Sequence, residues 1–313
     1  MLQIEHLSRR YGSRPALKNL SFSAGEHEII ALMGRNGAGK STLMNILTGY
    51  LAPSEGKVSI GGYDVQSCAI AARKLVGYLP ETPPLYPDLT VREYLTYCAQ
   101  LKGVDKKQLR QEVDRVINRA GLNEYRNRLS RALSKGYRQR LGMAQALLGS
   151  PALLILDEPG SGLDPLQMVQ MREMILDAAK ECTVLLSSHI LSEVTNICTR
   201  AIVIDAGELR YDGPMSVLLQ GENVLRVVFE GGAYVRDALA KIPGVNQVQG
   251  NSGEENALEV FCEKDVDIRG LISRCVAECG ATLLELTPLQ GGLEHAFLRL
   301  LDRDARVKEV QEA

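Results

Sequence analysis

The sequence lacks tryptophan and has only four phenylalanines among its 313 residues. A surface of aromatic side chains on which nucleic-acid bases stack is therefore not expected. The chain also lacks an excess of one charge, because 36 Lys and Arg residues stand against 38 Asp and Glu residues and leave a formal net charge of −2. Attachment to nucleic acid or to anionic lipid by bulk positive charge is not expected either.

Long apolar runs are missing as well. The longest, at 29–33 and 152–156, have five residues, whereas a membrane-spanning helix needs about 18 or more. We therefore do not expect the chain to cross a bilayer by itself. Its first residues lack a basic stretch followed by an apolar core, so a secretory signal is not expected.

Cysteine occurs seven times, an odd number without CxxC pairs. In a chain of this size the pattern indicates reduced, mostly buried thiols of a cytosolic protein rather than a disulfide framework. Cys275 and Cys279 lie four residues apart on an expected helix, but two thiolates alone make a poor zinc site. We interpret them as core residues.

The length suggests two domains, and a hydrophobic content of 45% is enough for a sizeable core. Over residues 1–221, short β-rich runs alternate with longer helical patterns, which is typical of an α/β fold with a mostly parallel sheet covered by helices. A helix is expected at 40–48, and a helical subdomain at about 83–148 has apolar residues at three- and four-residue spacings. Strands are expected at 2–6, 17–22, 28–33, 57–60, 75–79, 152–156, 183–187 and 201–204.

The pattern of predicted strands and helices changes after residue 221, and this change defines a second domain, 222–313. Its expected order is strand, helix, strand, strand, helix, strand, which fits the split βαβ motif of a small α+β, ferredoxin-like domain. A last amphipathic helix is expected to carry Leu293, Phe297 and Leu300 on one face. The other expected elements are strands at 224–229, 245–248, 258–261 and 282–287, and helices at 235–242 and 266–279.

A phosphate-binding loop is the clearest motif. Residues 34–41 read Gly-Arg-Asn-Gly-Ala-Gly-Lys-Ser, a complete GxxxxGK[ST] between an expected strand and an expected helix. Its glycines let backbone N–H groups curl around phosphate oxygens, and the helix N-terminus adds a favourable dipole. Lys40 can reach the β and γ phosphates, and the Ser41 hydroxyl suits magnesium. The predicted nucleotide-binding residues here are Gly34, Arg35, Asn36, Gly37, Ala38, Gly39, Lys40, Ser41 and Thr42.

A second motif is an apolar strand that ends in two carboxylates, Asp157 and Glu158. An aspartate at such a strand end can bind magnesium through water in P-loop enzymes. We therefore expect Asp157 to serve the metal. Glu158 is then the candidate catalytic residue that polarises the attacking water.

A third motif, Leu-Ser-Lys-Gly-Tyr-Arg-Gln-Arg at 133–140, lies between the first two. With it the chain resembles the ATP-binding subunits of ATP-binding-cassette (ABC) transporters, whose signature is commonly LSGGQ. The resemblance covers about residues 1–220, with the landmarks in order. It implies a P-loop NTPase cassette in which an antiparallel β subdomain and the helical subdomain accompany the parallel sheet, and it implies ATP and Mg²⁺ as cofactors.

Several further roles follow only from this resemblance. Tyr11 matches the aromatic residue that stacks on adenine, and Glu81 matches the position that usually presents Gln to magnesium and water. Asp164 lies in the loop that joins the two subunits. His189 matches the catalytic switch histidine on the γ-phosphate.

The resemblance also implies a homodimer. In this family the signature of one subunit faces the nucleotide held by the P-loop of the other, so Ser134 and the backbone of Gly136 would cap the γ-phosphate across the interface. One chain has one P-loop and one signature, so two chains complete each site in a head-to-tail arrangement. ATP would hold this dimer closed, and hydrolysis would release it.

The sequence departs from the common pattern at four positions. Lys135 and Tyr137 stand where Gly and Gln are usual, and Gly160 stands where Thr is common. Glu81 replaces Gln and adds a negative charge near the phosphates, although its oxygens can still bind magnesium. The segment that ends in Glu81 and the signature at 133–140 are similar in sequence to those of exporter-type subunits, including gliding-motility and multidrug-type systems. We therefore interpret the departures as subgroup traits.

The expected function is that of a cytoplasmic ATPase, peripheral on the cytoplasmic face of the membrane, that powers a separate integral-membrane permease. The similarity of these motif sequences to exporter-type subunits favours export. The family docks its membrane helix near 83–100, where Leu85, Tyr86 and Leu89 are equally well explained as anchors or as core residues.

Two alternatives remain. A soluble cassette ATPase acting on ribosomes or DNA is disfavoured by the single cassette and by the short spacing between P-loop and signature. An importer ATPase with a ligand-sensing C-terminal domain is the other, but no diagnostic pocket residues are evident, and dimer support is the favoured role of this domain. A basic cluster is better explained as a solvated, phosphate-proximal face than as a nucleic-acid site, so no nucleic-acid partner is expected. The cluster comprises Arg126, Arg128, Arg131, Lys135, Arg138 and Arg140.

Overall fold

The protein is described from a computed structural model. The described residues are 1–188, 191–219, 223–232, 234–251, 254–263 and 266–289. The chain divides into two compact units, Met1–Met215 and Ser216–Ala313, which we describe separately.

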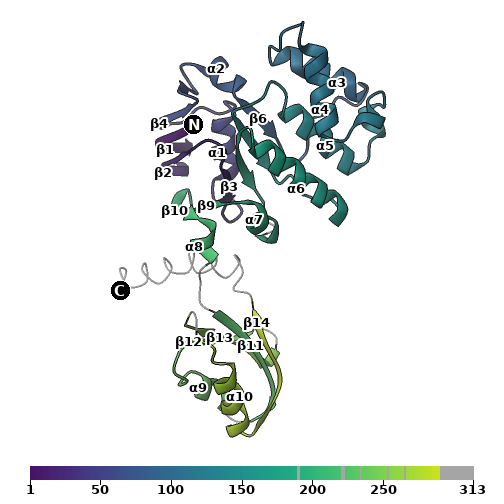
Figure 1. Cartoon of the computed structure of the whole chain (residues 1–313). Helices are drawn as coiled ribbons and strands as arrows, with labels where there is room; N and C mark the ends of the chain where they lie inside the picture. The colour runs from purple at the N-terminus through teal and green to yellow at the C-terminus, as the bar shows by residue number, and fades with distance from the viewer. Residues whose placement is uncertain (189–190, 220–222, 233, 252–253, 264–265, 290–313) are drawn as a thin grey trace. The chain divides into compact units, whose positions relative to one another are not determined.

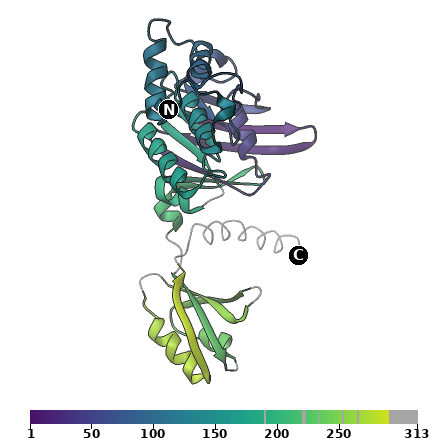
Figure 2. The ribbon, with the colours of Figure 1, turned by 90° about the vertical axis from the view of Figure 1, so that its right-hand side faces the viewer.

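An antiparallel sheet with the strand order β2-β1-β4-β5 begins the first unit. The two longest strands, β1 and β2, form an extended hairpin (Figure 2). The sequence predicts β1 only to residue 6, but the strand continues to Tyr11. Register shifts after Ile4 and a left-handed His6 (φ 50°) disturb the alternation on which the prediction depends. The strands are β1 (Leu2–Tyr11), β2 (Arg14–Ala24), β4 (Glu55–Ile60) and β5 (Tyr63–Asp64).

A six-stranded sheet with the order β10-β9-β3-β8-β7-β6 forms the centre of this unit. Neighbours from β9 to β6 are parallel, and β10 pairs antiparallel at the edge. All five residues of β3 and of β8 are buried, as expected for parallel strands covered on both faces. The strands are β3 (Ile29–Met33), β6 (Val76–Leu79), β7 (Leu153–Asp157), β8 (Thr183–Ser187), β9 (Arg200–Asp205) and β10 (Glu208–Pro214).

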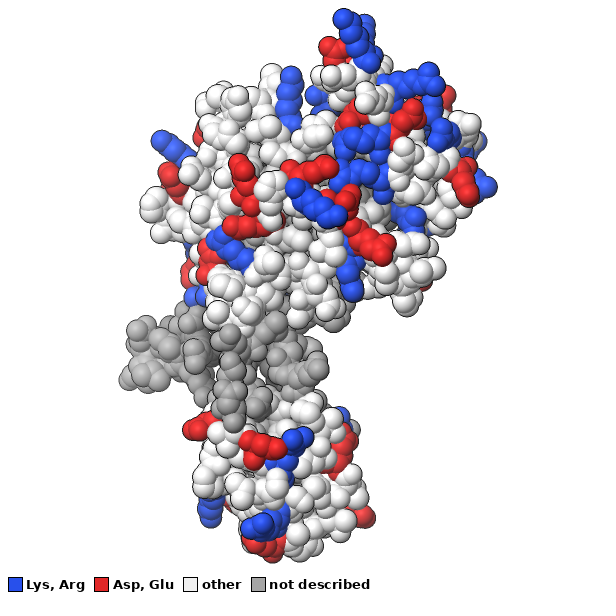
Figure 3. Space-filling model, in the orientation of Figure 1, with Lys and Arg blue, Asp and Glu red and all other residues white. Residues whose placement is uncertain are grey.

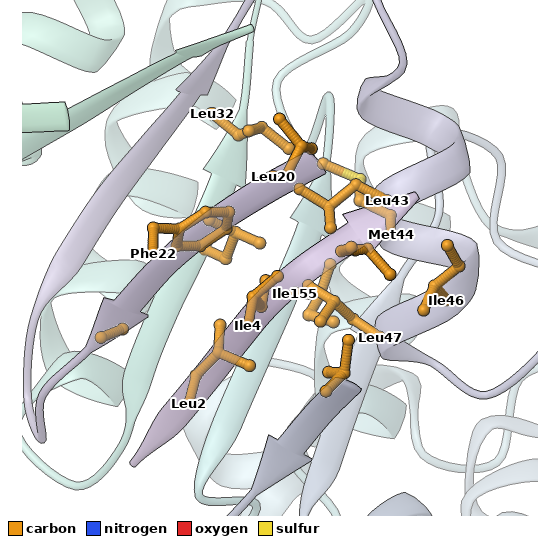
Figure 4. Close-up of a cluster of buried hydrophobic side chains, with 14 of the residues drawn as sticks. Leu2, Ile4, Leu20, Phe22, Leu32, Leu43, Met44, Ile46, Leu47 and Ile155 are labelled. Carbon is orange, nitrogen blue, oxygen red and sulfur yellow. The ribbon is translucent and has the colours of Figure 1, made fainter. Parts of the chain in front are cut away.

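The main core lies between the two sheets and α1 (Lys40–Leu47) (Figure 4). Side chains of β1 and β2, such as Ile4 and Leu20, meet Leu43 and Leu47 of this helix. Full burial of one leucine side chain contributes about 1.5–3 kcal/mol. This packing holds the N-terminal end of α1, where the phosphate-binding motif lies, against the sheet.

The helical subdomain gathers at one end of the unit (Figure 1). It contains α3 (Val91–Leu101), α4 (Leu109–Arg119) and α5 (Lys135–Ala146). A capping box between Thr90 and Glu93 begins α3, and α4 buries its predicted apolar face. The unit also contains α2 (Ala69–Lys74), α6 (Pro165–Ala179) and α7 (Leu191–Ile197), and α8 (Met215–Leu219) begins at its last residue and continues into the second unit.

One cation ties the helical subdomain to α6. The Arg119 guanidinium, near the end of α4, lies 2.7 Å from a carboxylate oxygen of Asp177 and 2.7 Å from one of Glu181. These carboxylates raise the pKa of Arg119 against the opposing effect of its burial. The pairs join segments that are far apart in the sequence.

The second unit is a four-stranded sheet with the order β12-β13-β11-β14, in which every pair of neighbours is antiparallel. This is the order that a split βαβ motif produces. Helices α9 and α10 accompany the sheet (Figure 1). The elements are β11 (Asn223–Gly231), α9 (Val235–Leu239), β12 (Val245–Asn251), β13 (Glu254–Cys262), α10 (Arg269–Glu278) and β14 (Ala281–Leu289).

Three sequence predictions concern this second unit. Cys275 and Cys279 are partly buried and pack against its apolar core. Helix α9 ends at Leu239 rather than at residue 242, because residues just before a proline, here Pro243, disfavour helix. The expected last helix with Leu293, Phe297 and Leu300 lies outside the described residues. Among the described helices, none is both long and apolar enough to span a membrane.

Candidate nucleotide-binding site

The loop between β3 and α1 is shaped by two glycines. Gly39 has a φ of 112°, and a Cβ there would lie 2.8 Å from the carbonyl oxygen of Ala16. A Cβ on Gly34 would collide with the carbonyl oxygen of Ile204 at the end of β9. Only glycine lets the loop pass this close to the backbone on both sides.

Lys40 holds the loop from inside. Its Nζ donates to the carbonyl oxygen of Gly34 at 2.6 Å and to that of Arg35 at 3.2 Å. Burial lowers the pKa of the Lys40 ammonium, and the carboxylates of Glu158 and Asp157 lie close enough to oppose this shift. Predicted residues from the P-loop and from the end of β7 therefore meet at one edge of the sheet.

Ser187 of β8 bonds both residues at the end of β7. Asp157 is in register with Ser187, whose Oγ donates to Asp157 Oδ1 at 2.6 Å. The Glu158 backbone N–H donates to the Ser187 carbonyl oxygen at 3.1 Å. Glu158 has a φ of 49°, a left-handed conformation uncommon for a residue with a side chain. Ser187 is not among the predicted site residues, although its place at the end of a predicted parallel strand is a usable signal.

Glu81 reaches this region from the segment after β6. Its Oε1 accepts a hydrogen bond from Ser161 Oγ at 3.4 Å, and Ser161 N–H donates to the Glu158 carbonyl oxygen at 3.0 Å. The loop after β7 thus connects Glu81 with Glu158. Three residues further along, Asp164 caps α6 by accepting from the Gln167 N–H at 2.8 Å.

The signature segment begins α5. The exposed Ser134 is its N-cap, and its Oγ accepts from the Tyr137 N–H at 3.4 Å. Gly136 is buried, and a Cβ there would collide with the carboxamide of Gln167 on α6. In this chain, close packing against α6 is therefore one reason for the glycine.

Tyr137, which departs from the common signature, has a packing role. Its ring lies on that of Tyr125 with a centroid distance of 4.1 Å, and the Arg140 guanidinium lies 5.2 Å from its ring centre. Other arginines of the basic cluster also have partners close by, Arg126 with Asn123 and Arg131 with Asp88. Lys and Arg side chains gather over α3, α4 and α5 among interspersed acids (Figure 3).

A groove of about 420 Å³ separates the segment after β6 from α5. Its walls combine apolar side chains with charges of both signs. Residues that line it, and that define what we name the Leu85 groove, include Glu81, Pro83, Leu85, Lys135, Arg138 and Gln139.

The described contacts do not bring Tyr11 into this arrangement. Tyr11 ends β1 in the antiparallel sheet, where its ring is half exposed and the Arg9 guanidinium lies 5.2 Å from the ring centre. His189 lies outside the described residues. The remaining predicted P-loop residues, Asn36, Gly37, Ala38, Ser41 and Thr42, follow the loop into the first turn of α1.

Comparisons with known proteins agree with the geometry. The family model described as ABC transporter matches residues 17–161. The uncharacterized ABC transporter ATP-binding protein YxlF of Bacillus subtilis (strain 168) is 32% identical over 302 residues, which cover 96% of this chain and 99% of the relative. The bacitracin transport ATP-binding protein BcrA of Bacillus licheniformis is 31% identical over 315 residues, which cover 96% of this chain and 97% of the relative.

A solved ATP-binding subunit of an ABC transporter has the same cassette architecture. It matches with a TM-score of 0.65 and 30% identity, covering 70% of this chain and 91% of the solved one. The resemblance and the fold class predicted from the sequence are confirmed. The chain belongs to the ATP-binding subunits of ABC transporters, and its activity is ATP hydrolysis coupled to transport.

Proposed function

We propose that this chain binds Mg²⁺ and ATP with the residues named above, closes as a head-to-tail homodimer on the cytoplasmic face of a membrane, and powers export through a separate permease. The observation that carries the proposal is that the parallel strands β3 and β7, both paired with β8, end at the same edge of the sheet and bring Lys40, Asp157 and Glu158 together there. That edge combines a cation, a row of loop N–H groups and two carboxylates. These are the groups that phosphoryl transfer from a nucleotide requires.

Magnesium is the metal that fits the donors. Ser41 presents an exposed hydroxyl, and Asp157 and Glu81 present carboxylates, which are the hard oxygen ligands that Mg²⁺ prefers. The described residues contain no group of three or more His, Cys, Asp and Glu side chains that could hold an ion by themselves. This agrees with a metal that keeps several waters and shares the phosphates. When bound, the ion would neutralise phosphate charge.

Glu158 is the proposed general base. Its backbone is held by Ser187 and Ser161, so the left-handed turn fixes where the carboxylate leaves the end of β7. Lys40 would neutralise phosphate charge once its N–H donors turn from the loop carbonyls to phosphate oxygens. Tyr11 and His189 keep the roles that the sequence predicts, adenine stacking and γ-phosphate contact.

The proposed dimer uses the exposed Ser134 at the N-terminus of α5 and the exposed Asp164 at that of α6. Helix N-termini suit anionic ligands, which supports a role for Ser134 and the Gly136 N–H on the γ-phosphate of the partner's ATP. We place the domain boundary near residue 221 and assign dimer support to the C-terminal unit.

Permease docking is proposed for the Leu85 groove. Leu85 is partly buried and lines it, whereas Tyr86 packs against the rings of Tyr94 and Tyr97. We therefore assign the anchor role to Leu85 and a packing role to Tyr86. Export is supported by similarity to relatives such as the bacitracin transport protein.

The substitution Glu158→Gln tests the catalytic part of the proposal. We expect unchanged ATP affinity, turnover lowered by about 100-fold or more, and an ATP-dependent dimer in sedimentation velocity. Glu173→Gln, at an exposed position of α6, is the matched control. Near-normal turnover of Glu158→Gln would remove Glu158 from the role of base.

Affinity purification of the tagged full chain tests the partner. An integral-membrane protein should copurify, and Leu85→Asp should lose it while retaining ATPase activity. Recovery of ribosomes or DNA without any integral-membrane protein would instead support the soluble alternative.

A further inference from the structure

Two opposite charges, Glu81 and Lys135, line the Leu85 groove. Glu81 comes from the segment after β6, and Lys135 is the first residue of α5. Both are exposed, and both stand where the common family pattern has an uncharged residue. The tertiary structure brings them to one groove from positions 54 residues apart in the sequence.

The two side chains also contact consecutive residues of the loop after β7. Ser161 Oγ donates to Glu81 Oε1 at 3.4 Å. The Lys135 ammonium lies against Gly162, so closely that a Cβ at Gly162 would collide with Nζ. Gly162 has a φ of 67°, which a residue with a side chain rarely adopts. The loop therefore presents the Ser161 hydroxyl to Glu81 and the backbone of Gly162, which has no side chain, to Lys135.

The other cations of the groove differ in their surroundings. Arg131 is already paired with Asp88 at 2.8 Å. Arg138 lies nearly one helical turn beyond Lys135 on α5 and lines the same groove. Lys135 differs from these two cations because it lies against Gly162. Gly162 directly follows Ser161, the residue that is hydrogen-bonded to Glu81.

A free carboxylate beside a nucleotide site has a cost. Like charges repel, so whenever Mg²⁺ is not bound to it, the Glu81 carboxylate is disfavoured near phosphate oxygens unless another cation compensates it. A cation that lines the same groove favours the orientation in which the carboxylate stays at Ser161. An uncharged amide at position 81 would have no need of this compensation.

We propose that Lys135 is a positioning residue for Glu81: its ammonium, beside Gly162, attracts the Glu81 carboxylate and so favours the position in which that carboxylate accepts from Ser161. The inference rests on the proposed place of Glu81 at the nucleotide site. The charge of Lys135 then acts on hydrolysis through Glu81. The pair links the segment after β6, the loop after β7 and the signature helix.

A double-mutant cycle on the full chain tests this proposal. The steady-state ATPase rate is measured for the unsubstituted protein, for Lys135→Met, for Glu81→Gln and for the double variant. We expect Lys135→Met to lower kcat by roughly two- to fivefold, the size typical of a partly exposed charge pair, and to leave KM for ATP nearly unchanged. In the Glu81→Gln background the same substitution should have little effect.

Two further variants separate charge from packing. Lys135→Arg should retain most of the rate, because it keeps the cation. Arg138→Met is the matched control in the same groove, and its effect should be the same with and without Glu81→Gln. Thermal denaturation of each variant verifies folding, and Lys135→Gln replaces Lys135→Met if the latter is unstable.

An equal effect of Lys135→Met in both backgrounds would overturn the inference and would assign Lys135 to direct contact with nucleotide. No effect in either background would overturn it as well. Failure of the proposed dimer is distinguishable, because it would appear as absent ATP-dependent dimerisation of Glu158→Gln, whatever the result of the cycle.

Discussion

Ser187 Oγ donates a 2.6 Å hydrogen bond to Asp157 Oδ1 and so joins the ends of two neighbouring parallel strands. Ser187 is fully buried, and its backbone carbonyl also accepts from the Glu158 N–H. One residue of β8 therefore bonds the side chain of Asp157 and the backbone of Glu158 at the end of β7. We therefore expect Ser187 to position the proposed metal ligand Asp157 and the backbone of the proposed base Glu158.

Ser187→Ala should lower ATPase activity by more than its loss of stability explains. Loss of the buried hydrogen bond costs about 1–2 kcal/mol in the free energy of unfolding, and a freely rotating Asp157 should raise the Mg²⁺ concentration needed for half-maximal rate. Thr183→Val is a matched control, because Thr183 Oγ1 makes a 2.7 Å bond to the Gly25 carbonyl oxygen at the other end of the same strand. It should reduce stability similarly and leave the Mg²⁺ dependence unchanged; an equal shift in both variants would contradict the orienting role.

Lys40→Ala should weaken ATP binding without unfolding the protein. Charge-assisted hydrogen bonds contribute about 1.5–3 kcal/mol, so affinity measured by calorimetric titration should fall by roughly 10- to 100-fold. Because burial lowers the pKa of Lys40, its removal relieves a desolvated charge, and the melting temperature should not fall greatly. Lys18→Ala, which removes a surface pair with Glu208, should bind ATP normally. Unchanged affinity in Lys40→Ala would contradict its phosphate role.

Lys102 predicts a pH-dependent difference in stability. Its Nζ donates to the Leu148 carbonyl oxygen at 2.6 Å, and burial lowers the pKa of Lys102 to about 8, below its value of about 10.4 in an unfolded chain. Below pH 8 the folded state must carry a desolvated charge. Between about pH 8 and pH 10 the unfolded chain binds more protons than the folded one, so the stability contribution of Lys102 becomes more favourable as pH rises.

Urea denaturation of Lys102→Met and of the unsubstituted protein measures this effect. The stability of the variant relative to the unsubstituted protein should fall by about 2 kcal/mol between pH 7 and pH 10. Lys107→Met, at an exposed position, should show no such trend. A constant difference for Lys102→Met would mean that its ammonium is not desolvated in the folded state.

Gly77→Ala should destabilise the first unit. A Cβ on Gly77 in β6 would collide with the backbone carbonyl of Ala146 at the end of α5, and backbone cannot move aside as a flexible side chain can. Overpacking of this kind costs about 1–3 kcal/mol, which would lower the thermal midpoint. Gly250→Ala in β12, where no heavy atom lies within 4 Å of the added Cβ, is the matched control and should change stability little. Equal stability of the two variants would contradict the close approach of α5 to β6.

The chemistry of each segment of this protein can be predicted from its own amino acids. The GxxxxGK[ST] spacing, the capping residue Ser134 and the apolar strand that ends in Asp157 and Glu158 depend on neighbours within a few residues. Turn geometry and hydrophobic periodicity act over that same range, so they predict the P-loop, α1 and β7 well. The comparisons confirm the family to which these motifs point.

The contacts between distant residues, in contrast, follow from the fold and from no local motif. The bond from Ser187 to Asp157, the contact of Gly136 with Gln167, and the approach of Glu81 and Lys135 to one loop each join segments separated by 27 residues or more. Such contacts depend on strand order and helix packing, which no short-range pattern in one sequence encodes. The motifs thus specify the chemistry of each segment, and the packing of the sheets and helices specifies which segments act together.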